Sequence, residues 1–385
     1  MVYRAIRQTV VATWLCIGLS QGAALADELE WTHYGIRPLG MGNAFVGVAD
    51  DYNALFYNPA GLARLTDWDA ELFNPMVEIS DTTVSFISDL SDLASGSAGD
   101  TDAVLDILED QTGKSHHFAL GLTPYFVMPN FGFGIGFKLN TTMAVHREIS
   151  TELDFGPRVI MPIQYAMNVV DGLSIGAGIK FVARGGVDRE FSVNDLQAFQ
   201  SDSSKDDSEE GESDDDGGSS IDEYVQGGYG YGADVGLLFT PIKTWEPTLG
   251  VSLTDIGGTP YEAADIGGES KLGNPDIRLP SLNTGISMKP WKQGEMYLMT
   301  SADVHAINQP IHYSKKFNLG LEWGYGSIIK VQGGLHQGEL STGFEFDVFL
   351  FSCRFVTYAE QLGTIAGQDD NLSDRRYALQ LKLLF

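Results

Sequence analysis

The sequence predicts an all-β protein, a transmembrane antiparallel β-barrel of about 14 strands with an N-terminal plug, or hatch, inside its lumen. Three observations predict this fold. Apolar residues alternate with small or polar residues along many short segments, as in FGFGIGFKLN at residues 131–140. Long and short connections between these segments also alternate. After the N-terminal region, no stretch contains the roughly 18 consecutive apolar residues that a membrane-spanning helix requires.

Residues 1–26 have the features of a signal peptide. Arg4 and Arg7 provide a basic start, residues 10–19 an apolar stretch, and residues 24–26 a small-residue cleavage site. We therefore expect an exported protein. Removal of this segment leaves Cys353 as the single cysteine, which excludes an intramolecular disulfide.

The alternating segments are interpreted as strands, each close to the length that crosses a bilayer when tilted. One face of such a strand is apolar and the other is small or polar, which suits a wall between lipid and a lumen, although a soluble β-sandwich also alternates. The expected strands are residues 68–80, 115–128, 131–146, 151–167, 172–190, 224–240, 246–255, 279–289, 295–305, 316–323, 328–336, 340–347, 349–358 and 374–385.

The lengths of the connections distinguish a membrane barrel from a sandwich. Connections after odd-numbered strands include the long loops 81–114, 191–223 and 256–278, whereas those after even-numbered strands are short, such as 289–294. Outer-membrane barrels have short periplasmic turns and long extracellular loops. We therefore expect a location in the outer membrane of a Gram-negative-type bacterium, contact with outer-membrane lipid, and periplasmic termini. The last strand would present Phe385 to the barrel-assembly machinery.

The formal net charge of −28 argues against nucleic acid as a partner. Much of it lies in residues 201–223, where eleven Asp or Glu accompany one Lys, a composition typical of a solvated, disordered loop. Part of this loop matches an EF-hand calcium template at Glu212, Asp214, Asp216 and Glu223. The first position and the apolar position of the template do not match. A plain solvated loop and loose cation binding are therefore both open, and no other metal site and no cofactor is expected.

The stretch GIRPLGMGNAFVGVADDYNALFYNPAGLARL, residues 35–65, is interpreted as the plug. It contains too many glycines and Asp-Asn-Pro breaks for a stable helix, yet too many apolar residues for a solvated linker. A barrel of about 14 strands leaves a lumen that needs an occupant. Inside that lumen an irregular backbone can bond to polar groups of the wall. We expect a hatch at residues 27–67 and a barrel at residues 68–385.

The same stretch carries a family resemblance. It resembles the hatch of the FadL-like outer-membrane transporters, and equally that of their PorV-like relatives, in Gly40, Gly42, Ala44, Ala49, Asp50, Asp51, Asn58, Pro59 and Ala60. In the transporter branch, the resemblance implies passive diffusion of long-chain fatty acids or other apolar compounds through a lateral opening in the barrel wall. In the PorV-like branch, it implies a scaffold or secretion-system partner without small-molecule transport.

The function expected from this resemblance is an outer-membrane channel for passive uptake or export of long-chain fatty acids or other hydrophobic small molecules. The hatch would be its gate, through Gly40, Gly42, Asp50, Asp51, Asn58, Pro59 and Ala60. For the Asn-Pro-Ala part the structural alternative is a turn fixed by Pro59, with Asn58 bonded to backbone groups. The alternative function is a PorV-like scaffold that holds a secreted or surface protein.

Apolar residues in the first long loop are candidates for ligand capture. They have a pattern compatible with two short amphipathic helices, and the candidates are Phe86, Leu90, Leu105 and Leu108. The alternative is that they pack on the barrel rim and cap the lumen.

No enzyme is expected from the sequence. The histidines do not have metal-ligand spacings such as H-E-x-x-H, and GGYGYG at residues 227–232 reads as a strand and not as a phosphate-binding loop. A Ser-His-Asn hydrolase on the barrel wall is the one enzymatic alternative, because such residues meet only in space. Its candidates are Ser115 and His116, at the start of the second expected strand.

Overall fold

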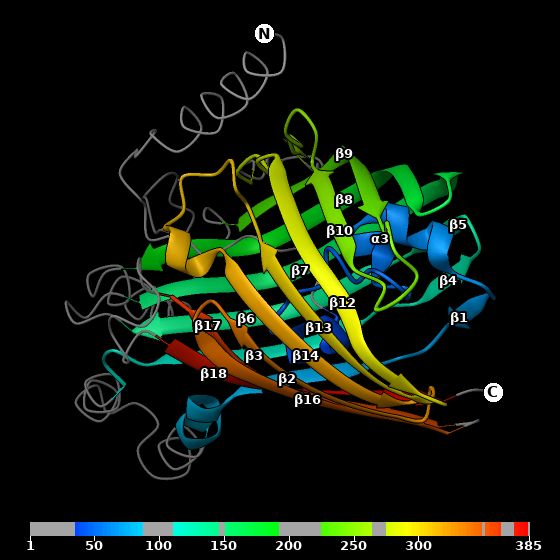
Figure 1. The fold of residues 1–385 in the computed structure, drawn as a ribbon. Helices are drawn as coiled ribbons and strands as arrows, with labels where there is room; N and C mark the ends of the chain where they lie inside the picture. Colours follow the sequence, from blue (N-terminus) through cyan, green and yellow to red (C-terminus); the bar gives the residue numbers. More distant parts are fainter. Residues whose placement is uncertain are drawn as a thin grey trace, which may run out of the picture.

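The computed structural model describes residues 35–87, 111–145, 151–191, 225–263, 275–348, 351–362 and 373–383. Within these ranges most of the chain forms β-strands, and the strands make a closed antiparallel barrel of 14 strands (Figure 1). The predicted antiparallel barrel of about 14 strands is therefore confirmed.

Three wall strands are interrupted. The first consists of β1 (Asp69–Glu71) and β2 (Met76–Ser80), the second of β3 (Ser115–Leu122) and β4 (Tyr125–Met128), and the third of β5 (Phe131–Gly134) and β6 (Gly136–Val145). The other eleven wall strands are β7 (Thr151–Val170), β8 (Leu173–Phe191), β9 (Val225–Phe239), β10 (Thr248–Thr254), β12 (Ser281–Gln293), β13 (Met296–Val304), β14 (Phe317–Tyr325), β15 (Ile329–His336), β16 (Glu339–Val348), β17 (Phe351–Gln361) and β18 (Ser373–Leu383).

Closure depends on one pairing between the ends of the chain. Strand β18 pairs antiparallel with β2, from Arg376 opposite Ser80 to Gln380 opposite Met76. The two-residue strand β11 (Glu262–Ala263) lies outside this circuit and pairs with β9. The predicted strand positions agree with the observed strands to within a few residues at most ends.

The strands are apolar on the outside and polar or small on the inside. In β14, Phe317, Leu319, Leu321, Trp323 and Tyr325 are exposed, and every residue between them is buried. This is the inverse of a soluble sandwich, whose apolar face packs in a core. The exposed side chains form the lipid-facing surface of a membrane barrel, which is why the sequence alternates with period two.

The long and short connections lie at opposite ends, because consecutive strands are antiparallel. We call these the loop end, which carries connections such as 81–114, and the turn end, which carries turns such as that at Asp171 and Gly172. One predicted turn, residues 289–294, is wrong. Strand β12 continues through this stretch to Gln293, with a bulge between Met288 and Trp291. Lys289 N donates to Trp245 O there, so the backbone stays bonded through the bulge.

Residues 35–65, called the N-terminal segment below, lie inside the ring of strands (Figure 1). They form three short helices, α2 (Ile36–Gly40), α3 (Ala54–Tyr57) and the 3-10 helix η1 (Pro59–Arg64), joined by irregular chain. Helices α3 and η1 contact β5, β7, β8 and β9, and α2 contacts β15 to β18. Almost all side chains of these helices are buried. None of the helices in the described ranges has the length and apolar character needed to cross a membrane.

Candidate functional site: the contact between the N-terminal segment and the barrel wall

The N-terminal segment rests on a row of glycines in the wall. A Cβ on Gly334 would lie 2.4 Å from the Gly42 nitrogen, and a Cβ on Gly250 would lie 2.4 Å from the Val46 carbonyl oxygen. Because these positions have no side chain, the two backbones touch directly. The row consists of Gly176, Gly236, Gly250, Gly285, Gly320, Gly334 and Gly343, on β8, β9, β10, β12, β14, β15 and β16 respectively.

The predicted hatch glycines Gly40 and Gly42 lie in this contact. A Cβ on Gly343 would lie 3.0 Å from the Gly40 Cα, and Ser341 Oγ donates to the Gly40 carbonyl oxygen at 3.3 Å. Gly42 has a φ of 62°, in the left-handed region, and a Cβ there would lie 2.3 Å from the Leu319 carbonyl oxygen. Position 42 therefore requires glycine for both its backbone conformation and its space.

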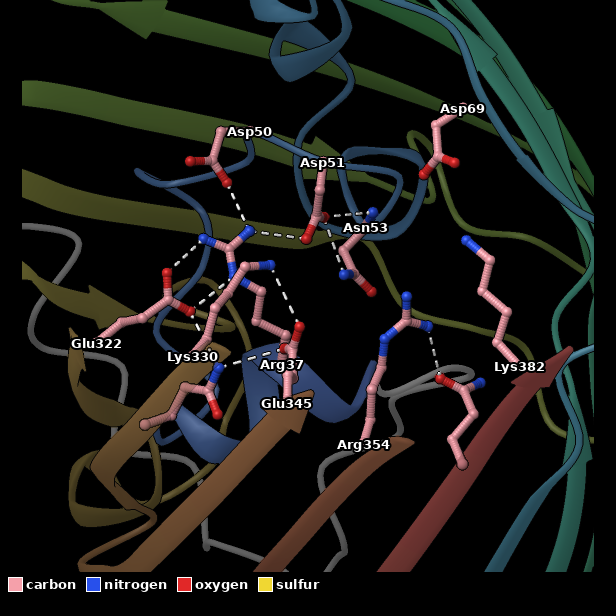
Figure 2. Close-up of polar contacts among 12 residues, drawn as sticks. Arg37, Asp50, Asp51, Asn53, Asp69, Glu322, Lys330, Glu345, Arg354 and Lys382 are labelled. Atoms are coloured by element: carbon pink, nitrogen blue, oxygen red, sulfur yellow. Dashed lines mark hydrogen bonds and ion pairs between the residues drawn. The ribbon is translucent and has the colours of Figure 1, made fainter. Parts of the chain in front are cut away.

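Asp50 and Asp51 meet Arg37, which joins the segment to the wall (Figure 2). Arg37 Nε and Nη2 donate to the two carboxylate oxygens of Glu322 on β14, each at 2.7 Å. Arg37 Nη1 donates to Asp50 Oδ1 and to Asp51 Oδ2, also at 2.7 Å. Arg37 and Glu322 are fully buried. The bidentate geometry fixes both the orientation and the position of α2 on the wall.

A second layer of polar residues holds Glu322. Gln332 Nε2 donates to Glu322 Oε2 at 3.1 Å and to Glu345 Oε1 at 3.2 Å, and Lys330 Nζ donates to Glu345 Oε2 at 3.2 Å. Tyr297 Oη donates to Glu322 Oε1 at 2.8 Å. Figure 2 shows Glu322, Lys330 and Glu345 gathered around Arg37. We call Arg37, Asp50, Asp51, Glu322, Lys330, Gln332, Glu345 and Tyr297 the Arg37 cluster.

Electrostatics keep the central pair charged. Burial by itself would lower the pKa of the Arg37 guanidinium, but the carboxylates of Asp50, Glu322 and Asp51 reverse this and raise that pKa well above its usual value. Burial would raise the pKa of Asp50, yet the adjacent Arg37 brings it below its ordinary value. The contact is therefore an ion pair at neutral pH.

Asn58 bonds the segment to two strands. Its Nδ2 donates to the carbonyl oxygens of Val46 at 3.0 Å and Leu237 at 3.2 Å, and lies 3.4 Å from that of Val251. Its Oδ1 accepts from Ala60 N at 3.2 Å, across Pro59 at the start of η1. Every polar atom of the Asn58 amide is thus used, which is the arrangement described by the structural alternative for Asn-Pro-Ala.

No protein-family model matches this sequence, and no curated protein is similar to it at a significant level. Solved structures do share the fold. The CymD monoaromatic hydrocarbon channel is 11% identical with a TM-score of 0.52, and the match covers 92% of this chain and 98% of that one. The Pseudomonas putida toluene transporter TodX is 12% identical with a TM-score of 0.51, and the match covers 94% of this chain and 100% of that one. The chain has the FadL-like transporter fold.

Of the Arg37 cluster only Asp50 and Asp51 were predicted as site residues, and the central pair of Arg37 and Glu322 was not. Arg37 is one of two cations, with Arg64, in a largely apolar stretch that also contains Asp50 and Asp51, and these charges were the available signal. Glu322 occupies an inward position between Leu321 and Trp323 and is the one charged residue of β14. An acid at such a position needs a buried cation, but the sequence does not say which cation meets it.

Of the candidate ligand-capture and metal-binding residues, only Phe86 lies in the described part of the chain. Phe86 lies in a helical stretch at residues 81–87, and its ring stacks on His116 with 4.4 Å between centroids, which is a packing contact at the loop end. Leu90, Leu105, Leu108, Glu212, Asp214, Asp216 and Glu223 lie outside the described residues, as does Phe385. Within the described ranges, no group of His, Cys, Asp or Glu is arranged to hold a metal ion.

The hydrolase candidates do not form a catalytic group in the described structure. His116 is buried beneath Phe86, whereas the hypothesis placed it on the lipid-facing side. The neighbouring His117 faces the interior and lies 3.0 Å from Glu78, a carboxylate also bonded by Lys138 and Tyr358. This group links strands β2, β3, β6 and β17 and has the arrangement of a structural polar network.

Proposed function

We propose that this FadL-like barrel is an outer-membrane channel for the passive passage of apolar small molecules, such as long-chain fatty acids or hydrocarbons, with residues 27–67 as its hatch and gate. The observation that carries the proposal is the N-terminal segment, which is held across the lumen by the glycine row and by the pair of Arg37 and Glu322. A barrel of this size without an occupant leaves an aqueous lumen.

The fold supports an apolar ligand. Two structures of similar fold are a monoaromatic hydrocarbon channel and a toluene transporter. Both are transport proteins, so we propose a non-enzymatic function here too. The long loops would be extracellular and the termini periplasmic, which brings a ligand from the loop end towards the turn end.

The two sides of the segment differ in how they can move. From β8 to β16 its backbone is in contact with the glycine row, so any displacement there separates two fitted surfaces. Near β1 and β4 its contacts are side-chain packing, such as the Tyr52 ring stacked on Tyr125 with 4.1 Å between centroids, and one backbone bond from Asn130 N to the Leu62 carbonyl oxygen. Side chains change rotamer far more easily than a packed backbone moves. We therefore propose that gating is local to this side and that the segment stays docked.

Uptake by cells tests the proposal. A host without a comparable channel would express the full chain or a variant lacking residues 35–65, and uptake of radiolabelled toluene and oleate would be measured. The full chain should increase uptake of at least one probe over the empty vector. The deletion variant should also admit hydrophilic antibiotics, because its lumen is open. Uptake equal to that of the empty vector for both probes contradicts the channel.

Mass spectrometry of the barrel purified from its own membrane in mild detergent distinguishes the channel from the alternative function, a PorV-like scaffold. A stoichiometric protein partner, with no apolar molecule bound, would favour the PorV-like scaffold. Apolar molecules held by the full chain and lost without residues 35–65 would favour the channel.

A further inference from the structure

The outer face of the wall has a hollow of about 430 Å³ that extends over the neighbouring strands β9, β10, β12 and β13 (Figure 1). Its lining is almost entirely apolar. Outward side chains border it, among them Phe239, Leu249, Ile286 and Met288, and each of these is exposed. Because these side chains belong to the lipid-facing surface described above, the hollow is a depression in that surface.

Small side chains on β13 contribute to the hollow. The outward residues of β13 that line it are Thr300 and Ala302, whereas the residues opposite them on β12 are Met288 and Ile286. A large side chain therefore lies beside a small one at two successive outward positions. This difference in size leaves space on the β13 side of the pair.

Two prolines border the hollow towards the turn end. Strand β9 ends before Pro241, and β10 begins at Thr248, directly after Pro247. A proline cannot donate to a strand ladder. Strand β12 continues beyond Ser287, which lies opposite Thr248, so it is longer here than its partner β10. The hollow lies at this step in the wall, since both prolines, Thr248 and Ser287 line it.

The wall behind the hollow is closed. All seven residues of β10 are paired with β12, and Leu249 to Leu253 are also paired with β9. The ladder between β12 and β13 is continuous from Thr284 to Met288. A molecule in the hollow therefore lies on the outside of the barrel and does not enter the lumen.

The inner face of the same strands carries the N-terminal segment. Ser287 Oγ donates to the Gly47 carbonyl oxygen at 2.8 Å, and Arg64 Nη2 donates to Thr248 Oγ1 at 2.9 Å. Ser287 and Thr248 also line the hollow. A single layer of wall residues thus separates the hollow from the segment.

The surroundings of the hollow indicate its occupant. Since the hollow is continuous with the lipid-facing surface, the molecules that reach it are membrane lipids, and its apolar lining suits a hydrocarbon chain. A concave site contacts such a chain on several sides, whereas a convex wall contacts it on one, so the hollow offers more dispersion contacts. Within a bilayer, packing of this kind decides which position a chain prefers.

The connection between the two prolines indicates where the headgroup lies. Trp245 and Ile242 in this connection are 66% and 54% exposed. Tryptophan is enriched at the boundary between membrane and water. The headgroup of a lipid in the hollow would therefore lie at the turn end, beside Trp245.

We propose that the hollow binds one acyl chain of a glycerophospholipid from the leaflet at the turn end, and that this bound lipid stabilises the wall on which the N-terminal segment is docked. A ligand that binds the folded barrel and not the unfolded chain raises its stability. The lipid supports the layer that contains Ser287 and Thr248, which hold Gly47 and Arg64 of the segment. The site is independent of passage through the lumen, and its test requires no transport.

Native mass spectrometry tests the site. The full chain would be purified in mild detergent, depleted of lipid, and titrated with palmitoyl-oleoyl phosphatidylethanolamine or with oleate. Ala302→Phe should fill the hollow, and Thr300→Phe should fill it independently from the next outward position. The matched control is Ala177→Phe, at an exposed alanine of β8 that does not line the hollow. Heat-modifiable electrophoretic mobility checks that each barrel is folded.

The expected result is one phospholipid that stays bound to the parent and to Ala177→Phe under conditions that remove all other lipid. Binding should be about tenfold weaker in Ala302→Phe and in Thr300→Phe, which corresponds to about 1.4 kcal/mol. Equal retention in all four barrels overturns the site, because lipid then binds the outer surface without preference for the hollow. Oleate retained in preference to the phospholipid overturns the phospholipid as the occupant.

The stabilising effect has its own readout. The midpoint of guanidinium unfolding should rise when the phospholipid is added to the parent and to Ala177→Phe, and should not change in Ala302→Phe. A rise of the same size in Ala302→Phe would show that the lipid acts elsewhere on the barrel, and this removes the hollow as the cause.

Discussion

Arg37 and Glu322 are 285 positions apart in the chain and are joined by two parallel hydrogen bonds of 2.7 Å inside the barrel. Each charge compensates the cost of burying the other. Asp50 and Asp51 bond to the remaining nitrogen of the same guanidinium, so one side chain both folds the N-terminal segment and attaches it to β14. Removing one partner of such a group leaves an uncompensated charge, which costs more than the bond itself contributes.

Replacing Arg37 with Ala should therefore destabilise the folded barrel by about 3–5 kcal/mol, because Glu322 becomes a buried carboxylate without a cation. Arg37→Lys should recover only part of this, since a lysine cannot form the bidentate contact. The measurement is guanidinium unfolding in detergent micelles. As a control, Lys243→Gln removes an exposed ion pair with Asp171 and should have no measurable effect. Equal stability of Arg37→Ala and this control would refute the assigned role.

Two adjacent glycines of β15 should respond differently to alanine. Gly334→Ala would place a Cβ 2.4 Å from the Gly42 nitrogen, whereas a Cβ on Gly333 meets nothing within 4 Å. The first variant should loosen the N-terminal segment and increase ion conductance in planar bilayers, and the second should not. Similar conductance in both variants would show that the backbone contact does not seal the lumen.

Asn58→Ala should weaken the attachment of the segment to β9 and β10. It removes the donor shared by the carbonyl oxygens of Val46 and Leu237 and leaves them buried without it, at a cost of about 1–3 kcal/mol. The expected result is a lower unfolding midpoint with unchanged ligand specificity. A change in the relative uptake of toluene and oleate at unchanged stability would instead support a direct gating role for Asn58.

Acid should loosen the segment. The pKa of Asp50 is lowered below its ordinary value of 3.8 because the adjacent Arg37 outweighs the effect of burial. A carboxyl with a depressed folded-state pKa contributes stability that is complete above the ordinary value and is lost as the pH falls below it. Bilayer conductance should therefore stay constant from pH 7 to about pH 5 and rise below about pH 4. Asp50→Asn should reduce this rise, and an identical acid response in that variant would assign it to other groups.

The strands could be predicted because their signal is local. In β14 each outward residue is apolar and each inward one is polar or small, so the face of every residue is readable along a few positions. The turn at residues 289–294 was misplaced for the same reason. A bulge at Lys289 carries the ladder past a proline that, in the sequence, marks an ending.

The sequence by itself determined the barrel, its two kinds of end and the unusual character of residues 35–65, because alternation and composition are properties of neighbouring residues. Only the tertiary structure decided that Arg37 meets Glu322 and that seven strand glycines face one backbone. These relationships depend on the register and stagger of strands distant in the chain. A shift of one residue would turn Glu322 from the lumen to the lipid, so only the closed barrel sets the partners.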